Sequence, residues 1–224
     1  MFDTNSQKLL TSLLILSSLI VTHIGCREFT QDELGNIFDR HCKQLKHTEI
    51  TQQPLLITFS GTPGMGKSFI AKKLEDIYSG VRISTDELRS LFDTIDPHAV
   101  KDYDFALQQY LQYFTNQFKM PNKRFILDAS IDRKYEHIIA FCKKNNIPLI
   151  VIRLDVPHDL IIQRLHNREG NRAAWYLKHF DAMFSNYCNF AQTYRDYILF
   201  SNLDDADLSD LTQAINQRIN TITH

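Results

Sequence analysis

The chain has 224 residues, enough for one large α/β domain with an extension, and its charges nearly cancel. Its 25 Lys and Arg against 26 Asp and Glu leave a formal net charge of −1. A dedicated nucleic-acid-binding protein usually carries a basic excess, so the composition argues against that class, although it leaves room for a local basic groove. The four cysteines form no C-x-x-C pair, which is typical of reduced thiols in a reducing compartment.

The first fifty residues are predicted to form a helical extension. Residues 9–24 are rich in Leu and Ile and carry no charge, but these 16 residues are fewer than the roughly 20 that a membrane-spanning helix needs. Three interpretations stay open: a helix packed on the domain or on a partner, which we favour, a membrane anchor, and a cleaved signal peptide. The first predicts a cytoplasmic protein, and the second a membrane-associated one. Residues 29–47 are predicted to form a second helix.

From residue 54 onward, apolar strands alternate with amphipathic helices. Strands are predicted at 54–60, 81–84, 124–129, 148–154 and 197–200. Helices are predicted at 68–78, 86–92, 98–119, 133–145, 157–169, 172–195 and 207–222. This alternation predicts an α/β fold with a mainly parallel sheet of about five strands, sandwiched by helices. We therefore expect an N-terminal helical extension over 1–50 and one α/β domain over 51–224.

The most informative motif is the run 61–68, Gly-Thr-Pro-Gly-Met-Gly-Lys-Ser, which fits G-x-x-x-x-G-K-[ST] at every fixed position. It lies between a predicted strand and a predicted helix, where its backbone N–H groups can converge on phosphate oxygens at the positive end of the helix dipole. Lys67 is expected to reach the β- and γ-phosphates, and the Ser68 hydroxyl to ligate Mg²⁺. The residues predicted to bind the nucleotide are Gly61, Thr62, Pro63, Gly64, Met65, Gly66, Lys67, Ser68 and Phe69.

A second motif, D-x-x-R, follows the next predicted strand at Asp86 and Arg89. Two interpretations of Asp86 stay open. It can activate an acceptor hydroxyl, or it can simply favour the dipole of a helix that begins with the S-x-x-E capping box of Ser84 and Glu87.

Two more features follow in chain order. Asp128 stands near the end of an apolar predicted strand and is followed by Ala129 and Ser130. Arg164 and Arg168 are four residues apart and therefore share one face of a predicted helix.

Together, over about residues 55–200, these motifs resemble the phosphate-loop kinases that include polynucleotide 5′-hydroxyl kinase, chloramphenicol phosphotransferase and the zeta toxins. The resemblance implies the P-loop fold, ATP and Mg²⁺ as cofactors, and a lid around 159–172. Where the group usually has Asn after its Asp-Ala-Thr turn, this chain has Ile131. The roles it implies are catalytic for Lys67, Asp86, Arg164 and Arg168, substrate-binding for Arg89, Ser130 and Arg133, and metal-binding for Ser68 and Asp128.

The predicted function is therefore an ATP-dependent kinase that transfers the γ-phosphoryl group to a hydroxyl of a small molecule or nucleotide. One alternative is a polynucleotide 5′-hydroxyl kinase or a nucleotide-sugar kinase similar to the zeta toxins. The other is a nucleotide-binding ATPase or regulator without an acceptor. The sequence contains neither the N-K-x-D motif of GTPases nor the S-G-G-Q signature of transport ATPases. The near-neutral charge favours a small-molecule acceptor over nucleic acid.

Overall fold

The computed structural model describes residues 29–44, 55–95, 124–133, 135–167, 171–201 and 208–222. The chain divides into two compact units, one made of residues 1–44 and 86–119 and the other of residues 45–85 and 120–224. The apolar segment 9–24 and the predicted helix 98–119 lie outside the described residues, and the predicted division at residue 50 stays a prediction. None of the described helices is both long and apolar enough to cross a membrane.

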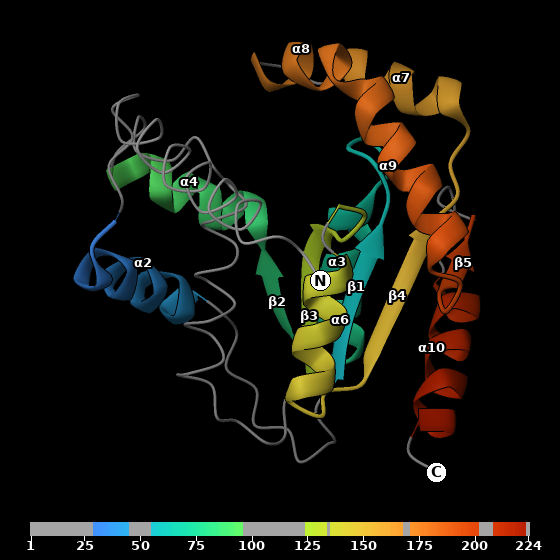
Figure 1. The fold of residues 1–224 in the computed structure, drawn as a ribbon, viewed down its shortest axis with the longest axis horizontal. Coiled ribbons are helices and arrows are strands. Elements are labelled where there is room, and N and C mark those ends of the chain that lie inside the picture. Colours follow the sequence, from blue (N-terminus) through green and yellow to red (C-terminus); the bar gives the residue numbers. More distant parts are fainter. Residues whose placement is uncertain are drawn as a thin grey trace, which may run out of the picture. The chain divides into compact units, whose positions relative to one another are not determined.

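The larger unit is built on a five-stranded sheet in which all the paired strands are parallel (Figure 1). Its strands are β1 (Leu55–Ser60), β2 (Val81–Ser84), β3 (Arg124–Ser130), β4 (Leu149–Leu154) and β5 (Ile198–Phe200). Across the sheet they stand in the order β2-β3-β1-β4-β5. The central strand β1 is buried at every position, which explains why it reads as a nearly continuous apolar run. The predicted parallel α/β fold is confirmed.

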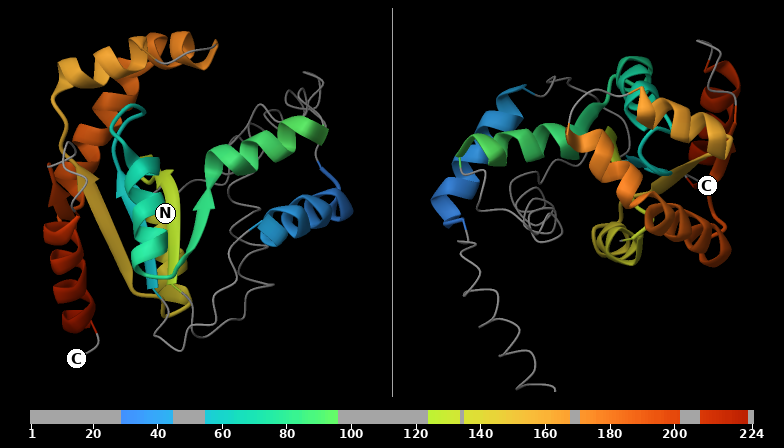
Figure 2. Two further views of the ribbon diagram at one scale, coloured as in Figure 1. Left: turned by 180° about the vertical axis from the view of Figure 1, so that it is seen from behind. Right: turned by 90° about the horizontal axis from the view of Figure 1, so that it is seen from above.

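The helices of the larger unit are α3 (Lys67–Ile77), α6 (Tyr135–Lys144), α7 (His158–His166), α8 (Asn171–Lys178), α9 (Phe180–Thr193) and α10 (Ser209–Ile222). Helices cover both faces of the sheet, whereas α7 and α8 lie beyond the ends of its strands (Figure 1). Figure 1 shows α6 in front of the sheet, and the view from behind in Figure 2 shows α3 in front. The Tyr78 hydroxyl, just after α3, donates to the Thr212 carbonyl of α10 at 3.2 Å. On the other face, the ring of Tyr135 on α6 packs edge-on against Phe190 of α9.

The break between α8 and α9 corrects the prediction of one helix over 172–195. His179 has a non-helical backbone (φ −108°, ψ 11°), and α9 begins at the next residue. Neither Gly nor Pro marks this point, so the local sequence gives no signal of a turn. The two helices bury side chains of their own, Tyr176 from α8 and Phe180 and Tyr187 from α9. Tertiary packing therefore imposes the bend.

The strand order reverses at β1 and β3. The chain leaves β1 through α3 for β2 at one edge, and it leaves β3 through α6 for β4 on the far side of β1. Open α/β sheets bind ligands beyond the carboxyl ends of the strands at such a switch point. The two strands also lose register there, because Thr58 pairs with Leu127 whereas Phe59 pairs with Ser130. Bulges of this kind often re-aim a side chain beside a functional site.

The smaller unit contains α2 (Gln31–Gln44) and, apart from its first residue, α4 (Thr85–Ile95). Helix α2 begins with a reciprocal capping box. The Thr30 N–H donates to the Glu33 carboxylate at 2.9 Å, and the Glu33 N–H donates to the Thr30 hydroxyl at 3.3 Å. The rings of Phe29 and Phe92 pack with centroids 5.1 Å apart. Both helices were expected from the sequence, and the structure gives their bounds.

Candidate nucleotide site

The phosphate loop lies between β1 and α3, and its glycines have backbones that other residues rarely adopt. Gly64 and Gly66 have φ of 90° and 91°. A Cβ on Gly64 would stand 3.1 Å from a methyl carbon of Ile161, so this residue also allows α7 to approach closely. Gly66 is the N-cap of α3, and no side chain caps that end by a hydrogen bond. A helix N-terminus of this kind is an anion site, because its N–H groups and the helix dipole both favour negative charge.

Lys67 lies folded over the loop. Its ammonium group donates to the carbonyl oxygens of Gly61 at 2.9 Å and Thr62 at 2.8 Å. The cation is thus held above the same run of backbone that would cradle the phosphates. The loop therefore presents a positive charge beside the N-terminus of α3, as its motif predicts.

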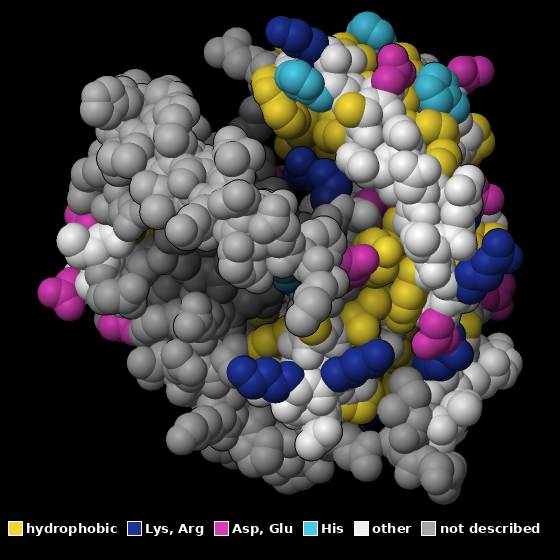
Figure 3. Space-filling view, viewed as in Figure 1, with side chains coloured by type: hydrophobic (Ala, Val, Ile, Leu, Met, Phe, Trp, Pro, Cys, Tyr) yellow, Lys and Arg dark blue, Asp and Glu magenta, His cyan; other side chains and the backbone are white. Residues whose placement is uncertain are grey.

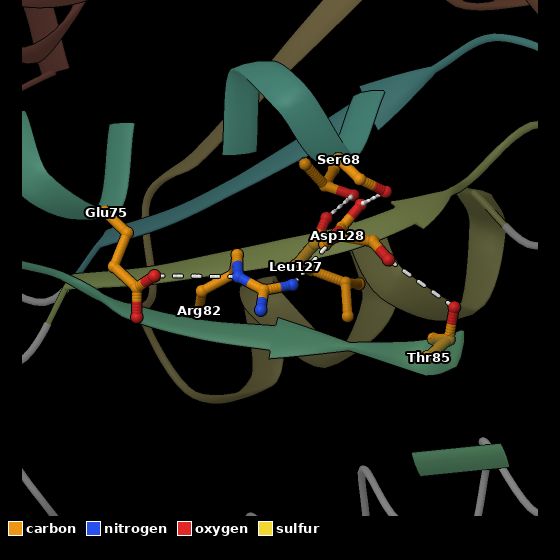
Figure 4. A network of polar contacts seen from close by, with 7 residues as sticks. Ser68, Glu75, Arg82, Thr85, Leu127 and Asp128 are labelled. Carbon is orange, nitrogen blue, oxygen red and sulfur yellow. Dashed lines mark hydrogen bonds and ion pairs between the residues drawn. The ribbon is translucent and has the colours of Figure 1, made fainter. Parts of the chain in front are cut away.

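Ser68, one residue further along α3, is joined to the end of β3 (Figure 4). Its hydroxyl donates to Oδ1 of Asp128 at 2.9 Å, and Arg82 of β2 donates to the other oxygen, Oδ2, at 2.9 Å. The Thr85 hydroxyl donates to the Asp128 carbonyl at 3.4 Å. The strand register explains why Asp128 has contacts on both sides. Asp128 pairs with Ser84 of β2, whereas on the β1 side it lies in the register shift between Thr58 and Phe59.

The carboxylate of Asp128 is buried, and the balance of its surroundings decides its charge. Burial raises the pKa of Asp128, whereas the hydrogen bond from Ser68 and the positive charges of Arg82 and Lys67 oppose that rise. No group of three or more His, Cys, Asp or Glu side chains that could hold a metal ion occurs among the described residues. Mg²⁺ would therefore depend on the oxygens of Ser68 and Asp128 together with those of a bound nucleotide. Hard oxygen donors in this small number suit Mg²⁺.

A tight turn after β3 fastens the loop from the other side. Oδ2 of Asp132 accepts the Gly61 N–H at 3.0 Å, and the Ile131 N–H donates to the Phe59 carbonyl at 2.9 Å. Within the turn, the Asp132 N–H donates to the Ser130 hydroxyl at 3.3 Å. Asp132 is 8% exposed, so its charge lies inside the protein beside the loop. The turn and the phosphate loop are thus held at a fixed separation.

Three residues of this arrangement were not predicted from the sequence: Arg82, Asp132, and Glu75 of α3, whose carboxylate lies 3.5 Å from Nε of Arg82. Arg82 carried a signal, since it is the one charged residue in the strand Val-Arg-Ile-Ser, and a buried charge needs a partner. Glu75 and Asp132 each stand between an apolar and a charged residue in the sequence, and nothing in the pattern sets them apart.

The predicted lid is described in part. Arg164 on α7 donates to the Gly64 carbonyl at 3.5 Å, which places this arginine beside the loop. Arg168 lies outside the described residues. Figure 3 shows histidine and hydrophobic side chains on the surface at the α7 and α8 end of the larger unit, where Trp175 is 53% exposed.

The remaining predicted residues are placed as follows. Asp86 and Arg89 stand on α4 in the smaller unit, so their position relative to the loop is not described. Ser130 and Arg133 are exposed at the end of β3 and just after it. Phe69 is 50% exposed, and the Lys73 ammonium stands 4.8 Å from its ring centre. The structure therefore brings together Lys67, Ser68, Asp128 and Arg164, whereas the roles of all the predicted residues stay proposals.

Comparison with known families decides what kind of domain this is. The AAA_33 family, described as an AAA domain, matches residues 56–188, more than half of the chain. The chain belongs to this AAA domain family. The matched part runs from β1 through the phosphate loop to α9. A search of the curated proteins finds no match to this chain.

Solved structures share its fold at low sequence identity. A structure from the PezAT chromosomal toxin-antitoxin system of Streptococcus pneumoniae is 12% identical, with a TM-score of 0.58, and covers 88% of this chain and 99% of its own. The tunicamycin resistance protein of Deinococcus radiodurans is 12% identical, with a TM-score of 0.52, and covers 75% of this chain and 96% of its own. A protein of Chloroflexus aurantiacus, provisionally assigned as a kinase, is 13% identical, with a TM-score of 0.51, and covers 76% of this chain and 98% of its own. The resemblance of the AAA domain to phosphate-loop kinases is thus confirmed for family and fold.

Proposed function

We propose that this protein is an ATP-dependent kinase that transfers the γ-phosphoryl group of ATP to a hydroxyl of a small molecule or nucleotide. The observation that carries the proposal is the contact between Ser68 and Asp128 at 2.9 Å, directly beside the Lys67 ammonium and the uncapped N-terminus of α3. The Lys67 ammonium supplies a cation, and the N-terminus of α3 supplies an anion-binding site. The Ser68 hydroxyl and the Asp128 carboxylate supply two oxygen ligands. The kinase-like fold supports the same conclusion.

Phosphoryl transfer places strong demands on positioning, because its transition state is loose and its charge is spread over the outer phosphate oxygens. In the proposed mechanism, the loop N–H groups and Lys67 bind the phosphates. Arg164, next to the Gly64 carbonyl, supplies a further positive charge to the γ-phosphoryl group as it leaves. Ser68 and Asp128 would hold Mg²⁺, which neutralises phosphate charge when it is bound. Closure of the α7 and α8 region would exclude water and so limit wasteful hydrolysis.

The acceptor side of the proposal rests on Asp86 and Arg89. Asp86 would accept the proton of the attacking hydroxyl, and Arg89 would bind the acceptor. The competing interpretation makes Asp86 a residue that only stabilises the N-terminus of α4. Asp86→Asn separates the two, because loss of a base lowers phosphoryl transfer by roughly 10² or more and leaves ATP affinity unchanged. Equal losses of transfer and ATP affinity would favour the structural interpretation.

The direct test is a screen with radiolabelled ATP against sugars, nucleosides, antibiotics and 5′-hydroxyl oligonucleotides. We expect label to appear on a small hydroxyl acceptor only when Mg²⁺ is present. Labelling of the oligonucleotides alone would favour the polynucleotide kinase instead. Binding of ATP without label on any acceptor would overturn the kinase proposal in favour of an ATPase or regulator.

A further inference from the structure

Arg82 occupies an unusual place for a charged residue. It belongs to β2, between the apolar Val81 and Ile83, and its side chain is only 10% exposed. Its guanidinium group lies between two carboxylates, with Nε 3.5 Å from Glu75 of α3 and a terminal nitrogen 2.9 Å from Asp128 of β3 (Figure 4). A buried arginine of this kind fixes geometry well, because its planar group holds the direction of each partner.

The two oxygens of Asp128 have separate partners. Oδ2 receives Arg82, and Oδ1 receives the Ser68 hydroxyl. With one oxygen held by a guanidinium, the carboxylate cannot rotate freely, and its other oxygen stays directed at Ser68. Helix α3 supplies the first and the last residue of the row of contacts that runs from Ser68 through Asp128 and Arg82 to Glu75. Ser68 and Glu75 are seven residues, or about two turns, apart on α3, and therefore lie on the same side of it.

We infer that Arg82 is a positioning residue for the metal site: it orients Asp128 so that Ser68 and Asp128 together present oxygen ligands to Mg²⁺. This inference rests on the proposed function, since it concerns the metal that accompanies ATP. Arg82 would influence nucleotide binding only indirectly, through the orientation of Asp128. Partners of metal ligands typically change metal affinity by about 10- to 100-fold when they are removed.

The test measures Mg²⁺ dependence of nucleotide binding. The metal-free protein is mixed with a fluorescent ATP analogue and titrated with Mg²⁺, and the half-saturating Mg²⁺ concentration is read for each variant. Arg82→Met should raise that concentration about tenfold or more, with nucleotide affinity returning close to the wild-type value at saturating Mg²⁺. Arg82→Lys keeps the charge without the planar fork and should give a smaller shift in the same direction.

Arg124→Met is the matched control. Arg124 also comes from this sheet, at the start of β3, but its guanidinium group lies over the Tyr78 ring at 5.3 Å rather than against Asp128. It should leave the half-saturating Mg²⁺ concentration unchanged even if it lowers the melting temperature. The control therefore separates loss of stability from loss of metal positioning.

The possible results are distinct. A folded Arg82→Met protein with the wild-type Mg²⁺ dependence would overturn the inference, and so would equal weakening of nucleotide binding at every Mg²⁺ concentration. If Arg82→Met does not fold, Arg82→Lys decides in the same way. A wild-type protein that binds no ATP analogue at any Mg²⁺ concentration would overturn the proposed function, and this inference with it.

Discussion

The phosphate loop and the network around Asp128 lie at the ends of adjacent strands, yet the sequence encodes them differently. The loop is eight consecutive residues, 61–68, whose spacing alone defines its geometry. The network joins side chains that are far apart in the chain: Ser68 and Asp128 are separated by 60 residues, and Arg82 and Asp128 by 46. A contiguous motif binds phosphates by its backbone, whereas a dispersed network sets the direction of a few side chains. Changes in the loop should remove most of the nucleotide binding, and changes in the network should alter its dependence on Mg²⁺.

The largest expected effect comes from Arg164, which reaches the loop from α7. Arg164→Ala should lower phosphoryl transfer on the order of 10³ while ATP binding falls much less, because this charge acts mainly in the transition state. Steady-state rates and ATP binding are measured on the same preparations. The exposed Arg195 serves as a control, since Arg195→Ala removes an arginine from the segment after α9. Equal losses in rate and binding for Arg164→Ala would make it a ground-state phosphate ligand.

Gly64 tests whether the backbone of the loop is essential. Gly64→Ala places a side chain at φ 90° and against Ile161, which should cost about 1–3 kcal/mol of stability and most of the ATP binding. In Gly35→Ala, by contrast, the new methyl group meets nothing within 4 Å in the middle of α2, and stability should rise by about 0.5–1 kcal/mol. Chemical denaturation gives both values. A neutral Gly64→Ala would show that the loop conformation is not required.

Asp132 joins the two regions, because it belongs to the turn after β3 and accepts the N–H of Gly61 in the loop. Asp132→Ala should weaken ATP binding about tenfold, the equivalent of one hydrogen bond to a charged group. Asp132→Asn keeps an acceptor oxygen and should restore most of the affinity. If both variants bind ATP equally weakly, the negative charge of Asp132, rather than its hydrogen bond, supports the loop.

The smallest effect concerns stability at alkaline pH. Burial raises the pKa of the Cys142 thiol from 9.0 to about 12. Between these values the unfolded state loses its proton and the folded state keeps it, so this thiol makes stability fall as pH rises from 9 towards 12. Cys142→Ala should therefore show a shallower fall in melting temperature over that range. The control Cys188→Ala keeps the buried thiol and should follow the wild-type slope, and identical slopes for all three proteins would remove Cys142 as a cause.

The sequence was sufficient for features carried by local patterns and insufficient for features created by packing. Strand and helix alternation predicts the parallel sheet, and consecutive residues define the phosphate loop from Gly61 to Ser68. The resemblance to phosphate-loop kinases assigned Ser68 and Asp128 to one metal site, and the structure joins their side chains by a hydrogen bond. The bend at His179 and the partners Arg82 and Asp132 could not be read in this way, because each depends on contacts made after the chain has folded.

The nucleotide site is tested most directly by one measurement, the binding of ATP in the presence of Mg²⁺ to wild-type protein, Lys67→Ala and Lys72→Ala. Lys72 is exposed on the same helix, whereas Lys67 lies against the carbonyls of the loop. Isothermal titration should show wild-type affinity for Lys72→Ala and a loss of about tenfold or more for Lys67→Ala, because one hydrogen-bonded charge to the phosphates is removed. Equal affinity of Lys67→Ala and wild-type protein would contradict a nucleotide site at the phosphate loop.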